Sequence, residues 1–191
     1  DNIKSTIEII YSGRVHPEKG LEILIKSYIL LLNEFNNIKL SIIGPVCVDD
    51  GGGGQKYKEK LNSLCTDISI NWINPVSDQK LLRDNLFRAD IFVYPSIAEK
   101  GETFGVAPLE AMAVGTATIV SNLNCFKDFL KDGFNGLIFD HRKLTPEIEL
   151  RDKIKKLILD KDFRNKISIN GAESARKFSN KNIALEYYND F

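Results

Sequence analysis

One stretch of the sequence decides the fold: the apolar run Ile91-Phe92-Val93-Tyr94, the break Pro95-Ser96, and then Glu102-Thr103-Phe104-Gly105-Val106-Ala107-Pro108-Leu109-Glu110-Ala111-Met112. We expect a strand, a loop and then a helix from about residue 105 to residue 114. A glycine beside a helix start lets a ligand approach the backbone, and the free N–H groups there favour an anion. Further into the helix, Glu110 is placed to accept hydrogen bonds from hydroxyls. These features suit a sugar attached to a phosphate, and the alternative is a loop followed by an ordinary amphipathic helix.

Short apolar strands alternate with helical patterns along the chain. The expected strands are residues 7–11, 40–43, 68–73, 91–94, 118–120 and 136–139. The expected helices are residues 21–35, 55–65, a helix ending at 87 with Ser77 or Asp78 as its cap, 105–114, 126–130, 146–178 with an interruption near 160–162, and 182–188. This alternation predicts an α/β fold, a doubly wound, Rossmann-like parallel sheet in a single domain over residues 1–191. Ligands of such sheets bind at the carboxyl ends of the strands, so the loops after the first and fourth strands share one rim.

The composition excludes several classes of function. The chain carries 26 basic and 26 acidic residues, and this balance argues against a nucleic-acid partner. Three widely spaced cysteines and two histidines give no zinc or disulfide pattern, so we expect no metal and a reducing compartment. No apolar run is long enough to cross a bilayer and no signal peptide opens the chain. We therefore expect a cytoplasmic protein, with peripheral attachment to the inner membrane face left open.

A second rim motif follows the first expected strand. Arg14 and Lys19 lie in a loop bracketed by Gly13 and Gly20. Two cations can neutralise a diphosphate, and fixed cations contribute most to a rate where charge develops on a leaving diphosphate. The alternative is a solvated surface loop in which Glu18 partly cancels the charge.

The order of these motifs resembles a known family. Gly13-Arg14-x4-Lys19-Gly20, then Pro95-Ser96, Glu102-x7-Glu110 and Gly115, resemble the C-terminal, donor-binding domain of retaining GT-B glycosyltransferases, the group 1 or family 4 type. The resemblance runs from the first strand to the trailing helices. It implies the C-terminal half of a GT-B fold, with the N-terminal acceptor-binding domain missing from this chain.

The resemblance implies a role for each matched residue. Arg14 and Lys19, with Gly13, would hold the donor diphosphate and assist catalysis. Glu102 would act on the donor sugar, and Glu110 would bind the ribose. The backbone N–H groups of the segment Phe104, Gly105 and Val106 would contact the sugar and phosphates, and residues 72–76 would lie by the base.

The resemblance also implies the substrates. The donor would be a UDP-, GDP- or ADP-linked sugar, transferred with retained configuration to a saccharide or lipid-linked acceptor, without a metal or other cofactor. The departing phosphate itself would take the acceptor proton. Because the acceptor half is missing, we expect the isolated domain to be inactive.

Some positions depart from the family pattern. Asn124 and Cys125 stand where a Gly-Gly pair is common, before the acid Asp128, and Asn74 replaces a usual glycine. The loop after the second strand is long and ends in Gly51-Gly52-Gly53-Gly54, which we interpret as a flexible loop because it matches no phosphate-binding fingerprint. Two alternatives stay open, a non-catalytic nucleotide-sugar-binding or protein-interaction module and a nucleotide-sugar epimerase of GT-B architecture.

Overall fold

A computed structural model describes residues 6–66 and 68–179 of the 191-residue chain. It contains a six-stranded sheet with the order β3-β2-β1-β4-β5-β6, in which every neighbouring pair is parallel. The strands are β1 Ile7–Ser12, β2 Ile38–Ile43, β3 Asn71–Ile73, β4 Ile91–Tyr94, β5 Ala117–Ser121 and β6 Leu137–Phe139. All residues of β4 and β5 are buried. This confirms the predicted doubly wound parallel sheet, covered on both faces.

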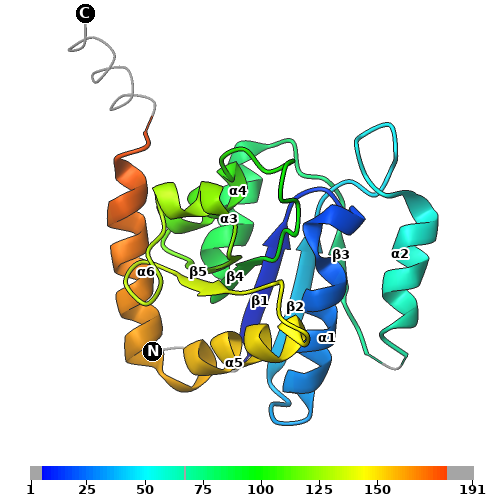
Figure 1. Cartoon of the computed structure of the whole chain (residues 1–191), viewed down its shortest axis with the longest axis horizontal. Helices are drawn as coiled ribbons and strands as arrows, with labels where there is room; N and C mark the ends of the chain where they lie inside the picture. Colours follow the sequence, from blue (N-terminus) through cyan, green and yellow to red (C-terminus); the bar gives the residue numbers. More distant parts are fainter. Residues whose placement is uncertain (1–5, 67, 180–191) are drawn as a thin grey trace, which may run out of the picture.

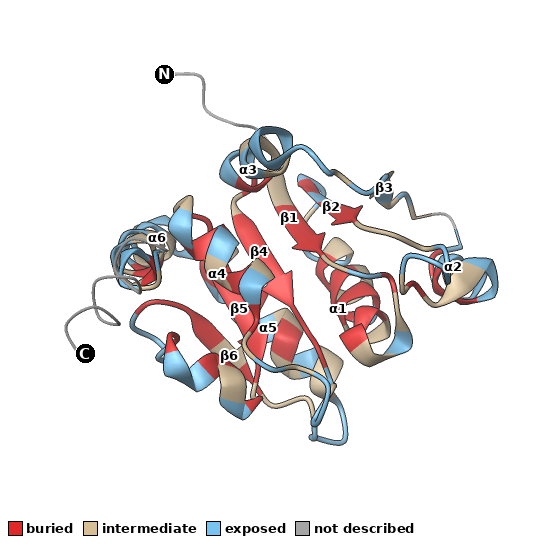
Figure 2. Ribbon diagram, turned by 90° about the horizontal axis from the view of Figure 1, so that it is seen from above, coloured by how far each residue is buried: buried red, intermediate tan, exposed pale blue. Residues whose placement is uncertain are grey.

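Helices lie on both sides of the sheet. They are α1 Leu21–Leu32, α2 Gly54–Ser63, α3 Gln79–Arg88, α4 Val106–Ala113, α5 Pro146–Leu159 and α6 Lys161–Arg176, with short 3-10 helices at Pro17–Lys19 and Asn124–Asp128. Figure 2 shows α3, α4 and α6 on one face and α1, α2 and α5 on the other. The carboxyl ends of the strands meet along one edge, toward the top of Figure 1. This edge is the predicted rim.

Several predicted boundaries were wrong. The third strand was predicted from residue 68, but pairing with β2 begins at Asn71, and Ile68 and Ile70 only pack against the core. The first helix was predicted to reach Phe35 and ends at Leu32, where Asn33 caps it. The helix expected at residues 126–130 is the 3-10 turn Asn124–Asp128.

Caps explain the boundaries that were predicted correctly. The side chain of Asp78, rather than Ser77, accepts the backbone N–H groups of Lys80 and Leu81 and starts α3. The Asp160 carboxylate accepts the N–H of Phe163 at 2.8 Å, which starts α6 and produces the expected interruption after α5. The helix predicted at residues 182–188 lies outside the described residues.

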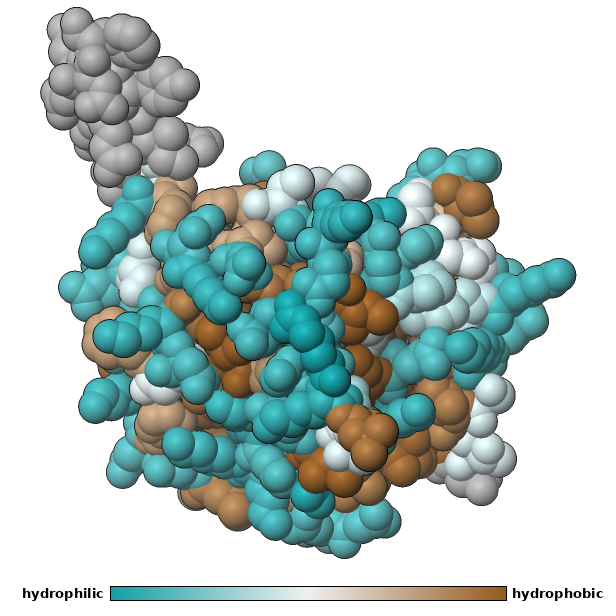
Figure 3. Space-filling view, viewed as in Figure 1, coloured by the Kyte–Doolittle hydropathy of each residue, from teal (hydrophilic) through white to brown (hydrophobic). Residues whose placement is uncertain are grey.

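No helix among the described residues is long and apolar enough to cross a membrane. The face seen in Figure 3 is mostly hydrophilic, with apolar side chains showing in patches between the polar ones.

Candidate functional site

The two motif loops are packed backbone against backbone at the rim. Gly20 has φ +67°, and a Cβ there would lie 2.0 Å from the carbonyl oxygen of Pro95. Two residues before Gly20, the Glu18 carbonyl accepts the backbone N–H of Ile97 at 2.8 Å. Only glycine allows this approach and this backbone conformation. The loop after β1 and the loop after β4 therefore lie at the same rim, as predicted, and are in direct contact there.

Lys19 and Glu102 form a buried ion pair between these loops. The Lys19 Nζ lies 2.7 Å from Glu102 Oε2, and the two side chains are 6% and 10% exposed. The same ammonium lies 5.5 Å from the ring centroid of Tyr94, whose hydroxyl donates to Glu102 Oε1 at 3.4 Å. The sequence predicted both residues at one rim but not their pairing.

Two stacked tyrosines lie beneath the motifs. The rings of Tyr11 and Tyr94 are 5.7 Å apart and nearly parallel, and the Tyr11 hydroxyl donates to the Arg14 carbonyl at 2.8 Å. Burial, followed by the nearby Glu102 charge, raises the pKa of Tyr94, and burial also raises the pKa of Tyr11. Both hydroxyls therefore stay protonated donors near neutral pH. Sequence reasoning missed them, although each stands at or beside the end of its strand.

Arg14 has other partners than Lys19. Its guanidinium lies 2.5 Å from Glu18 Oε1 and donates to the Gly51 carbonyl at 3.0 Å, with 43% of the side chain exposed. The glycine run predicted as a flexible loop is folded back on this motif, since Gly53 donates its N–H to the Val15 carbonyl at 2.8 Å. The expected partial cancellation by Glu18 is present, and Arg14 still reaches solvent.

The start of α4 presents backbone rather than side chains to the rim. Gly105 precedes the helix with φ +86°, and a Cβ there would lie 2.5 Å from the Phe126 ring. Within the described part of the chain, no side chain caps this eight-residue helix. Phe104 turns away and packs against Phe129 and Phe178, while Val106 is exposed. The first N–H groups of α4 are thus oriented to meet an anion.

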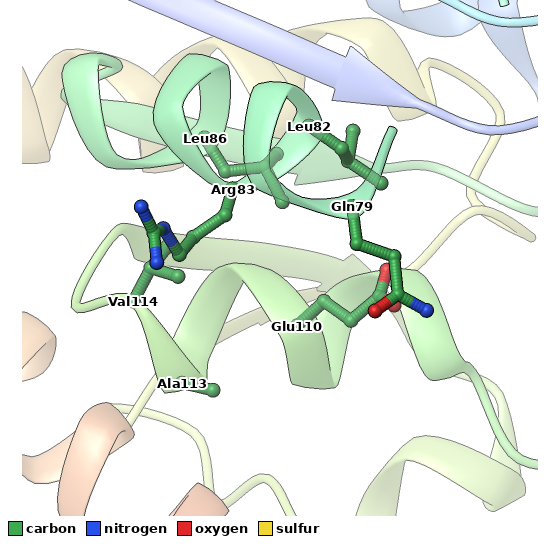
Figure 4. A pocket seen from close by; sticks show the side chains of 7 residues that line it. All are labelled: Gln79, Leu82, Arg83, Leu86, Glu110, Ala113 and Val114. Carbon is green, nitrogen blue, oxygen red and sulfur yellow. The ribbon is translucent and has the colours of Figure 1, made fainter. Parts of the chain in front are cut away.

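Glu110 lies apart from the Lys19–Glu102 pair. It lines a pocket of about 240 Å³ between α3 and α4. Gln79 lies beside Glu110 at one end of this pocket, and Arg83 lies near Val114 at the other end (Figure 4). The floor of the pocket is apolar, formed in part by Leu82 and Leu86. Desolvation raises the pKa of the Glu110 carboxyl. A polar end above an apolar floor suits a hydroxylated ring.

A separate hollow of about 490 Å³ follows β3. It is lined by residues 72–78 and by Leu81, which include the stretch expected near a base. Across the described ranges, no three His, Cys, Asp or Glu side chains are grouped so as to hold a metal ion.

The parallel sheet and the paired loops at its rim define a GT-B-type glycosyltransferase domain. The chain matches the family model described as glycosyl transferases group 1 over residues 2–174, and it belongs to that family. It is 24% identical over 188 residues to a D-inositol 3-phosphate glycosyltransferase of Nocardioides sp., covering 93% of this chain and 40% of that protein. It is 29% identical over 185 residues to the capsular polysaccharide biosynthesis glycosyltransferase CapM of Staphylococcus aureus, covering 95% of this chain and 45% of that protein.

Solved structures share the fold. Sucrose-phosphate synthase from Thermosynechococcus elongatus superposes with a TM-score of 0.82 at 20% identity, covering 97% of this chain and 45% of that one. HepE of Anabaena in complex with UDP and glucose gives a TM-score of 0.76 at 19% identity, covering 92% and 45%. The chain therefore spans less than half the length of these relatives.

Proposed function

We propose that this chain binds a nucleotide-diphosphate sugar at its rim and serves as the donor half of a retaining glycosyltransferase. The observation that carries the proposal is the Lys19–Glu102 ion pair beside the start of α4, which no side chain of the described residues caps. It joins a cation and a carboxylate from the two motifs next to the first backbone N–H groups of α4, where an anion would be stabilised. The UDP complexes of HepE, which has the same fold, support a nucleotide-sugar ligand.

The proposed diphosphate lies between Arg14 and the start of α4. Arg14 is exposed and shares its charge with Glu18, so it can turn its guanidinium toward phosphate oxygens. Lys19 reaches the same ligand only by sharing its ammonium between Glu102 and a phosphate. The N–H groups of Gly105 and Val106 complete the anion site.

Glu102 and Glu110 take different ends of the donor. Glu102, fixed by Lys19 and Tyr94, would orient the sugar or stabilise its developing positive charge. Glu110 and Gln79 would accept and donate hydrogen bonds to the ribose at their end of the α3–α4 pocket. The base would then lie along the hollow at residues 72–78.

The transfer itself requires an acceptor and, in this proposal, a second domain. Because the chain spans 40% and 45% of two curated relatives, we propose an N-terminal domain that binds a saccharide or lipid-linked acceptor against this rim. The departing phosphate would accept the proton of the acceptor hydroxyl while the new glycosidic bond forms on the same face of the sugar. Arg14 and the start of α4 would stabilise the leaving diphosphate, without a metal.

Calorimetric titration of this chain with UDP, GDP and ADP tests the proposal. We expect saturable binding of one nucleotide and a loss of about 1.5–3 kcal/mol of binding free energy in Arg14→Ala, the range of a charge-assisted contact. Arg176→Ala, at the end of α6, is the control and should bind normally. Absence of binding to all three nucleotides by the folded chain would favour the alternative, an interaction module.

A further inference from the structure

The turn after β6 reaches across the rim to the loop that carries Glu102. His141 Nε2 lies 2.9 Å from Glu99 Oε1, and Arg142 Nη2 donates to Glu99 Oε2 at 2.8 Å. Glu99 stands three residues before Glu102 in the same loop. Both oxygens of its carboxylate are thus held by one turn of the chain.

This contact involves more partners than a single surface ion pair, although Glu99 and Arg142 are each about half exposed. The His141 side chain is only 5% exposed, so its ring is fixed by its surroundings. Arg142 also donates through Nη1 to the Asn122 carbonyl at 2.9 Å, which ties in the loop after β5. Asp140 accepts the backbone N–H of Arg142 and holds the turn. Hydrogen bonds from Arg142, and then from His141, lower the pKa of the Glu99 carboxyl.

The contact falls where the loop has few other anchors. The start of the loop is fixed by the Ile97 N–H on the Glu18 carbonyl and by the Ser121 hydroxyl on the Ser96 carbonyl. The end of the loop is fixed at Gly105, the residue that directly precedes α4. Between these points, among the described residues, Glu99 and Glu102 anchor the loop through ion pairs, and Phe104 anchors its last part by packing against Phe129 and Phe178.

We propose that Glu99, His141 and Arg142 are positioning residues, which hold residues 97–105 so that Glu102 stays against Lys19 and faces the donor sugar. The role in sugar binding rests on the proposed function, whereas the role in fixing the loop does not. Glu99 acts through Glu102 and touches no substrate itself.

Amide hydrogen exchange on the ligand-free chain tests the fixing of the loop. In Glu99→Ala we expect exchange of the Glu102 and Ile97 amides to rise roughly three- to tenfold, because exposed ion pairs contribute only small free energies. Glu99→Gln, which keeps one acceptor oxygen for Arg142 but loses the charge, should restore part of the protection. Glu34→Ala is the matched control, because Glu34 also pairs with two basic residues, Arg151 and Lys155, at the opposite end of the sheet. Unchanged exchange of the loop in Glu99→Ala would overturn the proposal.

Calorimetry with UDP and with UDP-glucose tests the consequence for the sugar. A positioning role predicts that Glu99→Ala weakens UDP-glucose binding several-fold more than UDP binding, because Glu102 faces the sugar and not the nucleoside. Equal weakening for both ligands would contradict that role. If neither ligand binds the unaltered chain, the proposed function fails for uridine donors, and the exchange experiment still decides whether the contact fixes the loop.

Discussion

Lys19 and Glu102 are 83 positions apart in the sequence, yet their charged groups lie 2.7 Å from each other in a nearly closed space. Each motif therefore carries the counter-charge of the other. A carboxylate or ammonium of this kind is tolerated away from water only while its partner is present. Because of this ion pair, the geometry of the rim depends on both loops.

The first prediction concerns the loss of one partner. Lys19→Ala should lower the free energy of unfolding by on the order of 3 kcal/mol, because it leaves the Glu102 carboxylate buried without its cation. Adding Glu102→Gln should recover part of this loss, since the unpaired charge is then removed. Urea unfolding of both single variants and the double variant measures the coupling, and additive losses would contradict it.

The second prediction concerns the contact between the loops. Gly20→Ala places a methyl group against the Pro95 carbonyl at a positive φ, so the two loops must separate. Gly133→Ala is a matched control, with φ +73° and nothing within 4 Å of the added Cβ. The control should cost about 1–2 kcal/mol for the left-handed backbone alone. Gly20→Ala should cost clearly more in thermal or urea unfolding and should also weaken nucleotide binding; equal losses would refute the steric argument.

The third prediction concerns pH. Desolvation raises the folded-state pKa of Glu110 above its ordinary value of 4.5, so the folded chain holds this proton to higher pH than the unfolded chain does. The contribution of Glu110 to stability therefore falls as pH rises between these two pKa values. Glu110→Gln should remove this part of the pH dependence of unfolding. Nucleotide affinity should rise over the same window, because a carboxylate accepts ribose hydroxyls better than the neutral acid does. An unchanged pH profile in the Gln variant would argue against the assignment.

The fourth prediction concerns the cysteines. Cys47 is exposed, whereas burial raises the pKa of the Cys65 and Cys125 thiols. Because the thiolate is the reactive form, iodoacetamide near neutral pH should modify Cys47 first, as followed by mass spectrometry. After burial, the charge of Glu102 also raises the pKa of Cys125. A bound nucleotide sugar should slow the modification of Cys125 and leave Cys47 unaffected; faster reaction at Cys125 than at Cys47 would contradict the prediction.

Local patterns in the sequence predicted the layers and the rim, because period and glycine placement are local signals. Leu21, Leu24, Ile25 and Tyr28 recur at helical spacing and are buried in α1 as expected. The third strand was overpredicted because alternation at residues 68–70 reflects partial burial of Ile68 and Ile70 against the core, not pairing with β2. A local sequence pattern does not show whether a segment pairs with a neighbouring strand or packs against the core.

The details of the candidate site depended on such partners. The sequence predicted Arg14, Lys19 and Glu102 at one edge of the sheet. It did not show that Lys19 forms its ion pair with Glu102 and Arg14 forms its ion pair with Glu18. The Tyr11 hydroxyl finds its acceptor only three residues along the chain, and the Tyr94 hydroxyl finds Glu102 eight residues along. The stacking of the two rings, in contrast, requires that β1 and β4 are adjacent. The glycine run gave no sign that its backbone would bond to Val15.

The two outermost strands, β3 and β6, are each three residues long. An edge strand of this length offers few unpaired backbone groups to a further strand, so the sheet is poorly suited to grow by strand addition. Any large partner of this domain is therefore expected to dock through loops and helix surfaces, and the short edge strands present little template for aggregation.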